Sequence, residues 1–356
     1  MSSPAGASDT TAMRSGEQLD AESLGLYLRQ HLPDFGADLE IEQFPGGHSN
    51  LTYLLRAGGR EVVLRRPPLG PVPPRAHDMA REFRVLDTLS PHFAPAPGVI
   101  HLCEDESVIG AVFYLMERRR GVIPRREAPA EFSSQPAFPR RASLAFIDCL
   151  AELHSIDIFK HGLDKLGRPE GFLARQVEGW TRRWERAKTG EILIMDRVSG
   201  WLHEHLPPSQ AATVVHNDFK LDNIMLDPEN PGRVAAVLDW EMTSVGDPLI
   251  DLGIVMCYWP EAGDPLPRRN AISPLTTGAG WMSRAELMNR YHEKTGLDLA
   301  GMRYYEVFGL FKLAVVLQQI YSRYHAGQTS DERFRNFDER VRGLAESAGY
   351  VMSRAQ

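Results

Sequence analysis

The spacing of apolar residues changes once along this chain, and the change restricts the fold more than any other feature. Between residues 39 and 66 apolar and polar residues alternate, with breaks at Gly46-Gly47 and at residues 57–60. Alternation of period two predicts β-strands, and short glycine-containing breaks predict antiparallel hairpins. From about residue 143 onward, apolar residues recur at helical spacing, which predicts a mainly helical second part. The chain is therefore expected to be an α+β protein.

The first 117 residues predict five strands and two helices. One helix comes first, with Asp20 or Ser23 as its N-terminal cap. The second helix, over residues 76–89, follows the third strand. The five strands are expected at residues 39–43, 51–56, 61–66, 99–103 and 112–117. The remaining residues predict helices at 143–154, 171–188, 191–206, 248–258, 283–295, 302–324 and 333–352, and short strands at 214–215, 224–226 and 234–238.

The length divides naturally between these two parts. A chain of 356 residues is long enough for about two domains. Residues 1–18, rich in serine, alanine, glycine and threonine, are expected to form a disordered tail. Residues 19–117 would then form a small β-lobe, and residues 118–356 a larger helical lobe. The net charge of −7 argues against nucleic acid as a partner.

Cysteine usage and hydropathy indicate where such a protein works. Cys103, Cys149 and Cys257 are too few and too irregularly spaced for a disulfide framework or a zinc site. This usage favours a cytoplasmic protein. The most apolar late stretch, residues 308–320, includes Lys312 and two glutamines, so a buried helix is expected there and no membrane partner. The oligomeric state is left open.

One polar loop between two apolar strands carries the strongest chemical signal. Residues 214–226 read as strand, polar loop and strand, and the loop contains Asp218 and Asn223. A second apolar strand, at 234–238, ends directly at Asp239. Phosphoryl transfer needs a carboxylate to orient a hydroxyl and accept its proton, and oxygen ligands to hold Mg²⁺ against the phosphates. Asp218 suits the first role, and Asn223 and Asp239 the second. The alternative is that Asp218 and Asn223 only cap a turn.

Together these residues resemble the aminoglycoside phosphotransferase and choline kinase family, whose members are distant relatives of the protein kinases. The resemblance covers nearly the whole chain after the tail. It implies a protein-kinase-like fold of two lobes, with a small antiparallel β N-lobe and a larger, mainly helical C-lobe. It also implies Mg²⁺ as cofactor and ATP as co-substrate, with GTP as the alternative donor.

The resemblance assigns further roles around the loop. Lys220 lies two residues after Asp218, the spacing at which protein kinases carry a lysine that contacts the γ-phosphate. A solvated surface lysine is the alternative. His216 is expected to order the loop by hydrogen bonding and not to act as a base. Asp247 and Asp251 are implied to brace the loop from below.

The nucleotide side of the predicted site lies in the β-lobe. The Gly46-Gly47 turn and Ser49 resemble the family's nucleotide-positioning loop, whose backbone N–H groups can approach phosphate oxygens. The third strand carries Arg65 where kinases carry a phosphate-binding lysine, and arginine binds phosphate with a different geometry. Glu82 on the following helix is its expected ion-pair partner. By the same resemblance the hinge that meets the adenine edge is Leu115-Met116-Glu117.

The acceptor is expected to be a small molecule, because the segment between Asp239 and the next helix is too short for a kinase activation segment. Seven arginines and two glutamates give residues 118–141 a net charge of +5, which suits an anionic acceptor. Residues 63–68, 81–85 and 167–172 resemble the subgroup fused to acyl-CoA dehydrogenases in some proteins, which is linked to phosphorylation of hydroxyacyl-CoA.

The predicted function is therefore ATP- and Mg²⁺-dependent phosphorylation of a small metabolite hydroxyl, with a hydroxyacyl-CoA as the favoured acceptor. An aminoglycoside or another small hydroxylated molecule is the first alternative. A second alternative, from a different class, is a non-catalytic nucleotide-binding regulatory module, since Arg65 replaces the usual lysine.

Overall fold

The computed structural model describes residues 9–36, 38–45, 50–69, 77–329 and 331–354. The chain divides into two compact units, an N-terminal unit, Met1–Arg120, and a C-terminal unit, Gly121–Gln356. The nucleotide residues predicted at Gly46, Gly47 and Ser49 lie outside the described residues.

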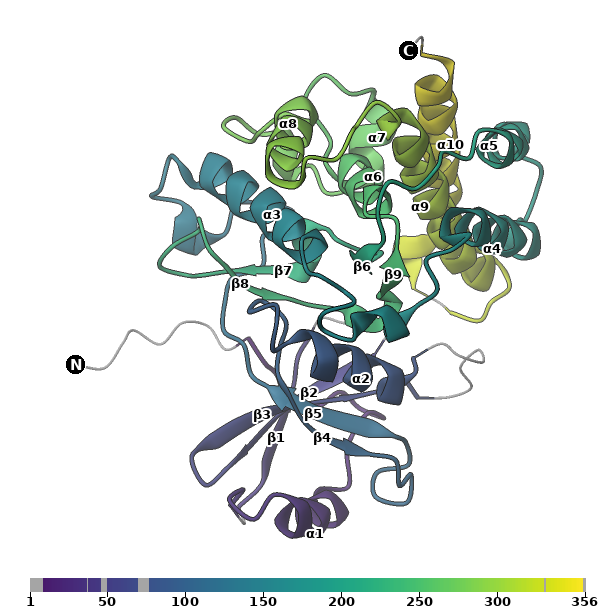
Figure 1. Ribbon diagram of the computed structural model, residues 1–356. Coiled ribbons are helices and arrows are strands. Elements are labelled where there is room, and N and C mark those ends of the chain that lie inside the picture. Colours follow the sequence, from purple (N-terminus) through teal and green to yellow (C-terminus); the bar gives the residue numbers. More distant parts are fainter. Residues whose placement is uncertain (1–8, 37, 46–49, 70–76, 330, 355–356) are drawn as a thin grey trace. The chain divides into compact units, whose positions relative to one another are not determined.

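A five-stranded antiparallel sheet forms the N-terminal unit. Its order is β1-β2-β3-β5-β4, so the last two strands are added in reverse sequence order beside β3 (Figure 1). Hairpin β2–β3 turns through Gly58 and Gly59, both with positive φ, which glycine adopts without the steric cost of a Cβ atom. The strands are β1 (Glu40–Gln43), β2 (Leu51–Ala57), β3 (Arg60–Arg66), β4 (Val99–Cys103) and β5 (Phe113–Glu117).

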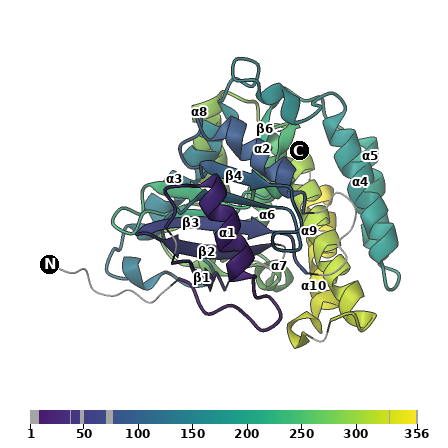
Figure 2. The ribbon, with the colours of Figure 1, turned by 90° about the horizontal axis from the view of Figure 1, so that it is seen from below.

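The two helices of this unit cover opposite faces of the sheet. Helix α1 (Ala21–His31) begins after Asp20, whose side chain accepts hydrogen bonds from two N–H groups of the first turn, and it lies across the strands (Figure 2). Leu64 of β3 belongs to the core cluster that α1 contributes to. Arg65, the next residue, bonds to Glu82 of α2 (Met79–Leu89). Since successive side chains of a strand point to opposite faces, β3 presents apolar residues to α1 and Arg65 to α2.

Residues 9–18, expected to be part of a disordered tail, have a defined place against this sheet. The backbones of Thr11 and Gln43 exchange two hydrogen bonds of 2.8 Å. The Tyr53 hydroxyl donates to the Glu17 carbonyl oxygen at 2.7 Å. The segment therefore extends the edge of the sheet next to β1.

Two small antiparallel sheets in the C-terminal unit carry the predicted catalytic loop. Strand β6 (Thr213–Val215) pairs with β9 (Ser244–Gly246), and β7 (Ile224–Leu226) pairs with β8 (Val234–Val237). Gly121 lies against β7, where a Cβ atom would come within 2.8 Å of the Leu226 carbonyl oxygen. Only glycine fits this approach at the start of the unit.

Helices form the rest of the C-terminal unit. Helix α9 is at its centre and packs against α4, α5, α6 and α10 (Figures 1 and 2). At the α6–α9 crossing the backbones touch, and a Cβ atom on Gly253 would lie 2.3 Å from the Tyr305 carbonyl oxygen. The helices are α3 (Phe138–His154), α4 (Phe172–Ala187), α5 (Leu193–Glu204), α6 (Leu249–Tyr258), α7 (Leu266–Ala271), α8 (Arg284–Thr295), α9 (Met302–His325) and α10 (Phe337–Ser353).

None of the helices in the described part of the chain has the length and apolar character needed to cross a membrane. The apolar stretch at 308–320 lies within α9, most of whose residues are buried, as predicted.

Candidate active site

The loop between β6 and β7 brings three predicted site residues together. Lys220 Nζ donates to Asp218 Oδ2 at 2.6 Å, and Asn223 Nδ2 donates to the same oxygen at 3.0 Å. Asn223 Nδ2 also reaches the Asp218 carbonyl oxygen at 2.9 Å. Two donors therefore fix one carboxylate oxygen of Asp218. Among the described residues no donor bonds to its second oxygen, Oδ1.

His216 orders the loop and is not placed as a base. Its ring is fully buried, and Nε2 lies 2.9 Å from the Leu238 carbonyl oxygen. The Asp218 N–H donates to Nδ1 at 3.2 Å. These two bonds require a neutral ring with its proton on Nε2. Burial lowers the pKa of His216 despite the nearby carboxylates, which favours that neutral form.

Asp251 of α6 holds the loop from beneath. Its carboxylate, 0% exposed, accepts the His216 N–H at 2.6 Å and the Asn217 N–H at 2.7 Å. His154 Nε2 lies 3.2 Å from the same carboxylate. Burial acts to raise the pKa of Asp251, but its contacts with His154 and the loop outweigh burial and lower it. Asn217 has φ of 63°, a left-handed conformation that these contacts stabilise.

Lys312 of α9 is a further contact to the loop, and no motif predicted it. Its Nζ donates to the carbonyl oxygen of Asn217 and lies 5.3 Å from the centre of the Trp180 ring. The side chain is buried, and burial lowers its pKa to about 8 despite the attraction of Asp218 and Asp251. The peptide group that precedes Asp218 is thus held at its oxygen by Lys312.

The backbone brings the two predicted cation ligands to neighbouring positions. The Leu238 N–H donates to the Asn223 carbonyl oxygen at 2.8 Å, which brings Asp239 beside Asn223. The amide nitrogen of Asn223 is committed to Asp218, so its Oδ1 remains as the ligand atom. Mg²⁺ in proteins takes one or two such oxygens and completes its shell with phosphate oxygens and water. The donor set therefore fits Mg²⁺ bound together with a nucleotide.

A surface hollow adjoins Lys220. Tyr258, at the end of α6, lines it, and Lys220 Nζ lies 5.1 Å from the centre of the Tyr258 ring. Burial raises the pKa of Tyr258. Burial acts to lower the pKa of Lys220, but its neighbours Tyr258 and Asp218, the second of which accepts a hydrogen bond from its Nζ, outweigh burial and raise that pKa. Lys220 therefore stays charged, which supports an electrostatic role over that of a surface lysine.

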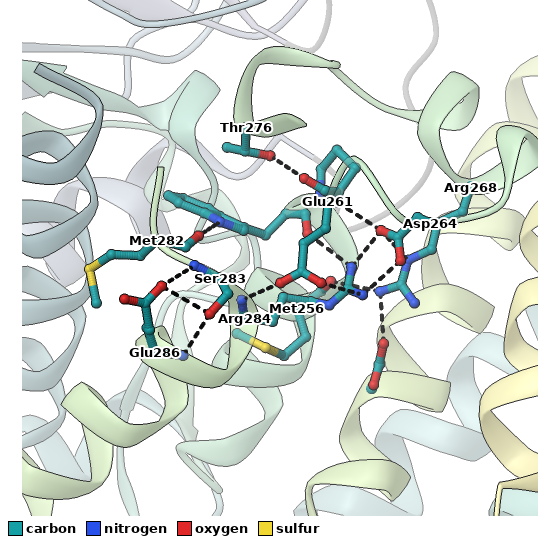
Figure 3. Close-up of polar contacts among 12 residues, drawn as sticks. Met256, Glu261, Asp264, Arg268, Thr276, Met282, Ser283, Arg284 and Glu286 are labelled. Carbon is teal, nitrogen blue, oxygen red and sulfur yellow. Dashed lines mark hydrogen bonds and ion pairs between the residues drawn. The ribbon is translucent and has the colours of Figure 1, made fainter. Parts of the chain in front are cut away.

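An ion-pair network fixes the segment that forms the far wall of the hollow. Arg284 makes two parallel bonds to Asp264, at 2.6 and 2.7 Å. The Arg284 N–H also donates to Glu261 at 2.6 Å, and Arg268 donates to the Met256 carbonyl oxygen at 2.9 Å (Figure 3). Thr276, a wall residue, donates to the Pro260 carbonyl oxygen at 2.8 Å. These bonds give residues 259–284 a fixed path between α6 and α8.

In the N-terminal unit the expected Arg65–Glu82 ion pair is formed. Arg65 Nε donates to Glu82 Oε2 at 3.1 Å, and the Glu82 side chain is 2% exposed. Met116 and Glu117 end β5, and the Glu117 side chain accepts the Gly98 N–H at 2.6 Å. Their predicted roles in binding nucleotide remain predictions.

The arginines of residues 118–141 do not gather at one site. Arg118 binds Asp9 at 2.7 Å and Glu61 at 2.8 Å, and Arg120 binds Glu61 at 2.6 Å. Acidic or carbonyl partners within their own units also engage Arg119, Arg140 and Arg141. The predicted concentration of positive charge is therefore wrong for these five. Arg125 is the member of the run that lines the hollow beside Lys220.

Comparison with known proteins decides the family. Residues 40–287 match the model of the phosphotransferase enzyme family that includes the aminoglycoside phosphotransferases. The chain belongs to this family. The predicted kinase-like fold is confirmed, with a five-stranded antiparallel sheet and a mainly helical C-terminal part. The chain is a phosphotransferase of this family, and the comparisons do not establish its acceptor.

Two of its curated relatives are named as acyl-CoA dehydrogenase family members. Acyl-CoA dehydrogenase family member 11 of Rattus norvegicus is 37% identical over 97% of this chain and 45% of its own length. Family member 10 of Mus musculus is 34% identical over 96% of this chain and 32% of its own length. The chain thus spans less than half the length of these curated relatives.

Among solved structures, an aminoglycoside phosphotransferase homologue from Ralstonia eutropha is 32% identical, with a TM-score of 0.78 over 95% of this chain and 100% of its own. Aminoglycoside phosphotransferase APH(4)-Ia, in a ternary complex with AMP-PNP and hygromycin B, gives a TM-score of 0.57 at 19% identity over 94% of this chain and 100% of its own. That likeness shows the fold.

Proposed function

We propose that this phosphotransferase moves the γ-phosphoryl group of ATP, in the presence of Mg²⁺, to a hydroxyl group of a small metabolite, and that the metabolite is a hydroxyacyl-CoA. The observation that carries the catalytic part is the state of the Asp218 carboxylate. Lys220 and Asn223 both bond to its Oδ2, which leaves Oδ1 to accept a proton from an acceptor hydroxyl.

The transfer step follows from this arrangement. The acceptor oxygen forms a bond to Pγ while the bond between Pγ and the β,γ-bridging oxygen breaks, and ADP leaves with that electron pair. Asp218 Oδ1 receives the hydroxyl proton. The Lys220 ammonium, paired with Asp218, is positioned to stabilise charge on the phosphoryl oxygens. A bound Mg²⁺, held by Asn223 Oδ1 and Asp239, would neutralise charge on the phosphates.

On the nucleotide side we assign binding to the N-terminal unit. Arg65, oriented by Glu82, would contact the α- and β-phosphates in place of the lysine of other kinases. Gly46, Gly47 and Ser49 would approach the phosphates, and the backbone at Met116 and Glu117 would meet the adenine. Binding of AMP-PNP by the distant relative APH(4)-Ia supports a nucleotide donor.

The choice of acceptor rests on the relatives and on the hollow. Two groups of relatives carry a segment like this chain within proteins named acyl-CoA dehydrogenases. A kinase that shares a chain with such an enzyme would act on a related acyl-CoA. Arg125 and Lys220 line the hollow together with one carboxylate, Asp222, and the excess of positive charge in this lining disfavours a polycationic aminoglycoside.

The test is ADP release by the purified protein with ATP, Mg²⁺ and a panel of hydroxyacyl-CoA esters, with kanamycin and hygromycin B as the competing acceptors. We expect turnover with hydroxyacyl-CoA, and a loss of at least about a hundredfold in kcat for Asp218→Asn, since a positioned base contributes roughly 10²–10⁴-fold. Phosphorylation of the sugars alone would refute the acceptor. Equal turnover by Asp218→Asn would refute the assigned base. Nucleotide binding without turnover of any acceptor would favour a regulatory module.

A further inference from the structure

Two polar side chains in the hollow beside Lys220 take no part in the proposed transfer step. Asp222 lies between Leu221 and Asn223 in the short helical turn that closes the catalytic loop. Tyr258 ends α6. Both line the hollow and both are half-buried. Neither is needed to hold the loop, which Asp251, His216 and Lys312 secure.

Their polar atoms are unengaged within the protein. Among the described residues, no other residue hydrogen-bonds to the Tyr258 hydroxyl or to the Asp222 carboxylate, although Lys220 and Arg125 attract that carboxylate. The other hydroxyl groups of the hollow are committed, because Ser273 donates to the Arg125 carbonyl oxygen and Thr276 to that of Pro260. Groups that are half-buried in a concave surface and lack protein partners are the ones that a ligand can satisfy without competition.

The two groups are chemically complementary. The phenol of Tyr258 donates a hydrogen bond, and the carboxylate of Asp222 accepts one. Leu221, Ile272 and Leu275 supply apolar wall between the polar groups. A flexible chain with methylene segments and one planar group that both donates and accepts would satisfy all of these features. A secondary amide is such a group, with its N–H suited to Asp222 and its carbonyl oxygen suited to Tyr258.

We infer that Asp222 and Tyr258 determine acceptor specificity by binding a secondary amide of the acceptor, next to the position from which its hydroxyl reaches Asp218. This inference rests on the proposed function, in which the acceptor is an acyl-CoA. The pantetheine arm of coenzyme A carries secondary amides separated by methylene groups. The hollow would therefore select the arm, and the apolar wall would contact its methylenes.

The experiment compares two acceptors that differ in the amide alone. A hydroxyacyl thioester of N-acetylcysteamine has one secondary amide, and the matching thioester of a simple alkanethiol has none. We measure kcat/KM for both with the wild type, Tyr258→Phe and Asp222→Asn. Each variant should lose about three- to tenfold for the amide-bearing thioester, the effect of one hydrogen bond, and little for the other. Ile272→Val is the matched control, because any effect of reshaping the wall should be equal for the two acceptors.

The outcomes separate the two proposals. If Tyr258→Phe and Asp222→Asn lower kcat/KM equally for both thioesters, the amide-binding role is overturned. The kinase assignment would then remain intact. No turnover of either thioester or of hydroxyacyl-CoA by the wild type would overturn the proposed acceptor itself. Because Asp222 adjoins Asn223, the KM for ATP is measured for each variant. If Asp222→Asn changes the KM for ATP, the amide-binding role is judged from Tyr258→Phe alone. That variant removes a hydroxyl group to which no described residue hydrogen-bonds.

Discussion

Replacing Lys312 with methionine should separate the stability of this protein from its activity. Lys312 is buried in α9 and donates to the carbonyl oxygen of Asn217, directly before the proposed base. The charged groups around it are Asp218, Asp251, Lys220 and Arg183. Methionine has a similar length and no charge, so Lys312→Met removes the ammonium group and leaves the apolar packing largely in place.

The energetic consequence follows from the pKa. Burial lowers the pKa of Lys312 from 10.5 to about 8, which corresponds to roughly 3 kcal/mol. Between these two values the unfolded chain binds a proton that the folded chain has lost. The free energy of unfolding therefore rises as the pH rises from about 8 to 10.5, and below pH 8 the folded protein bears the full cost of the buried charge.

Lys312→Met removes that cost, but the Asn217 carbonyl oxygen loses its donor, at roughly 1–3 kcal/mol. The two effects nearly cancel at pH 7, so we expect a Tm close to that of the wild type. The kcat should nevertheless fall by about ten- to a hundredfold, because the peptide group before Asp218 is no longer fixed.

The assay combines denaturant unfolding at pH 7 and pH 10 with steady-state kinetics. Between these pH values the wild type should gain about 2–3 kcal/mol relative to Lys312→Met. The matched control is Gln318→Met, on the same helix, whose buried amide donates to the Ala187 carbonyl oxygen at 2.9 Å; it should lose stability and keep kcat. The reasoning is refuted if Lys312→Met retains the wild-type kcat, or if the stability difference does not change with pH.

Two further predictions concern packing and the wall of the hollow. Gly253→Ala should destabilise the protein by about 1–3 kcal/mol in denaturant unfolding, because the new methyl group would meet the Tyr305 backbone; unchanged stability would mean that the two helices can separate there. Arg284→Lys should raise KM for the acceptor and leave KM for ATP unchanged in steady-state kinetics, because lysine cannot reproduce the two parallel bonds to Asp264; an equal rise in both KM values would contradict this.

Most of the secondary structure could be predicted because its signals are local. The helix predicted at 283–295 is α8 (Arg284–Thr295), and its start is marked by Ser283 and Glu286, which form a capping box. Helix α7 (Leu266–Ala271) and strand β9 (Ser244–Gly246) were not predicted. Both are too short to show a period, and long-range contacts determine them, β9 through its pairing with β6.

The candidate site also contains residues that local spacing predicted and residues that only the tertiary packing brings together. Asp218, Lys220 and Asn223 lie within one loop, so their spacing in the sequence predicted that they would meet. Lys312 was visible only as a charge within an apolar helix, which indicates a buried cation and not its partner. Tyr258 had no signal, because its place beside Lys220 depends on how α6 packs beneath the loop.

The arginine run shows why charge along a sequence is a weak guide to charge in space. The chain crosses from one unit to the other at residues 120 and 121, so neighbours in the run belong to different bodies. Glu61 lies far from Arg118 and Arg120 in the sequence, yet it contacts both because β3 and β5 pair. Arg125 forms no ion pair with a described acid, although the Asp222 carboxylate, which also lines the hollow, attracts it. Selection for an anionic acceptor would therefore act through Arg125 and Lys220, two cations from separate segments, and not through the run as a whole.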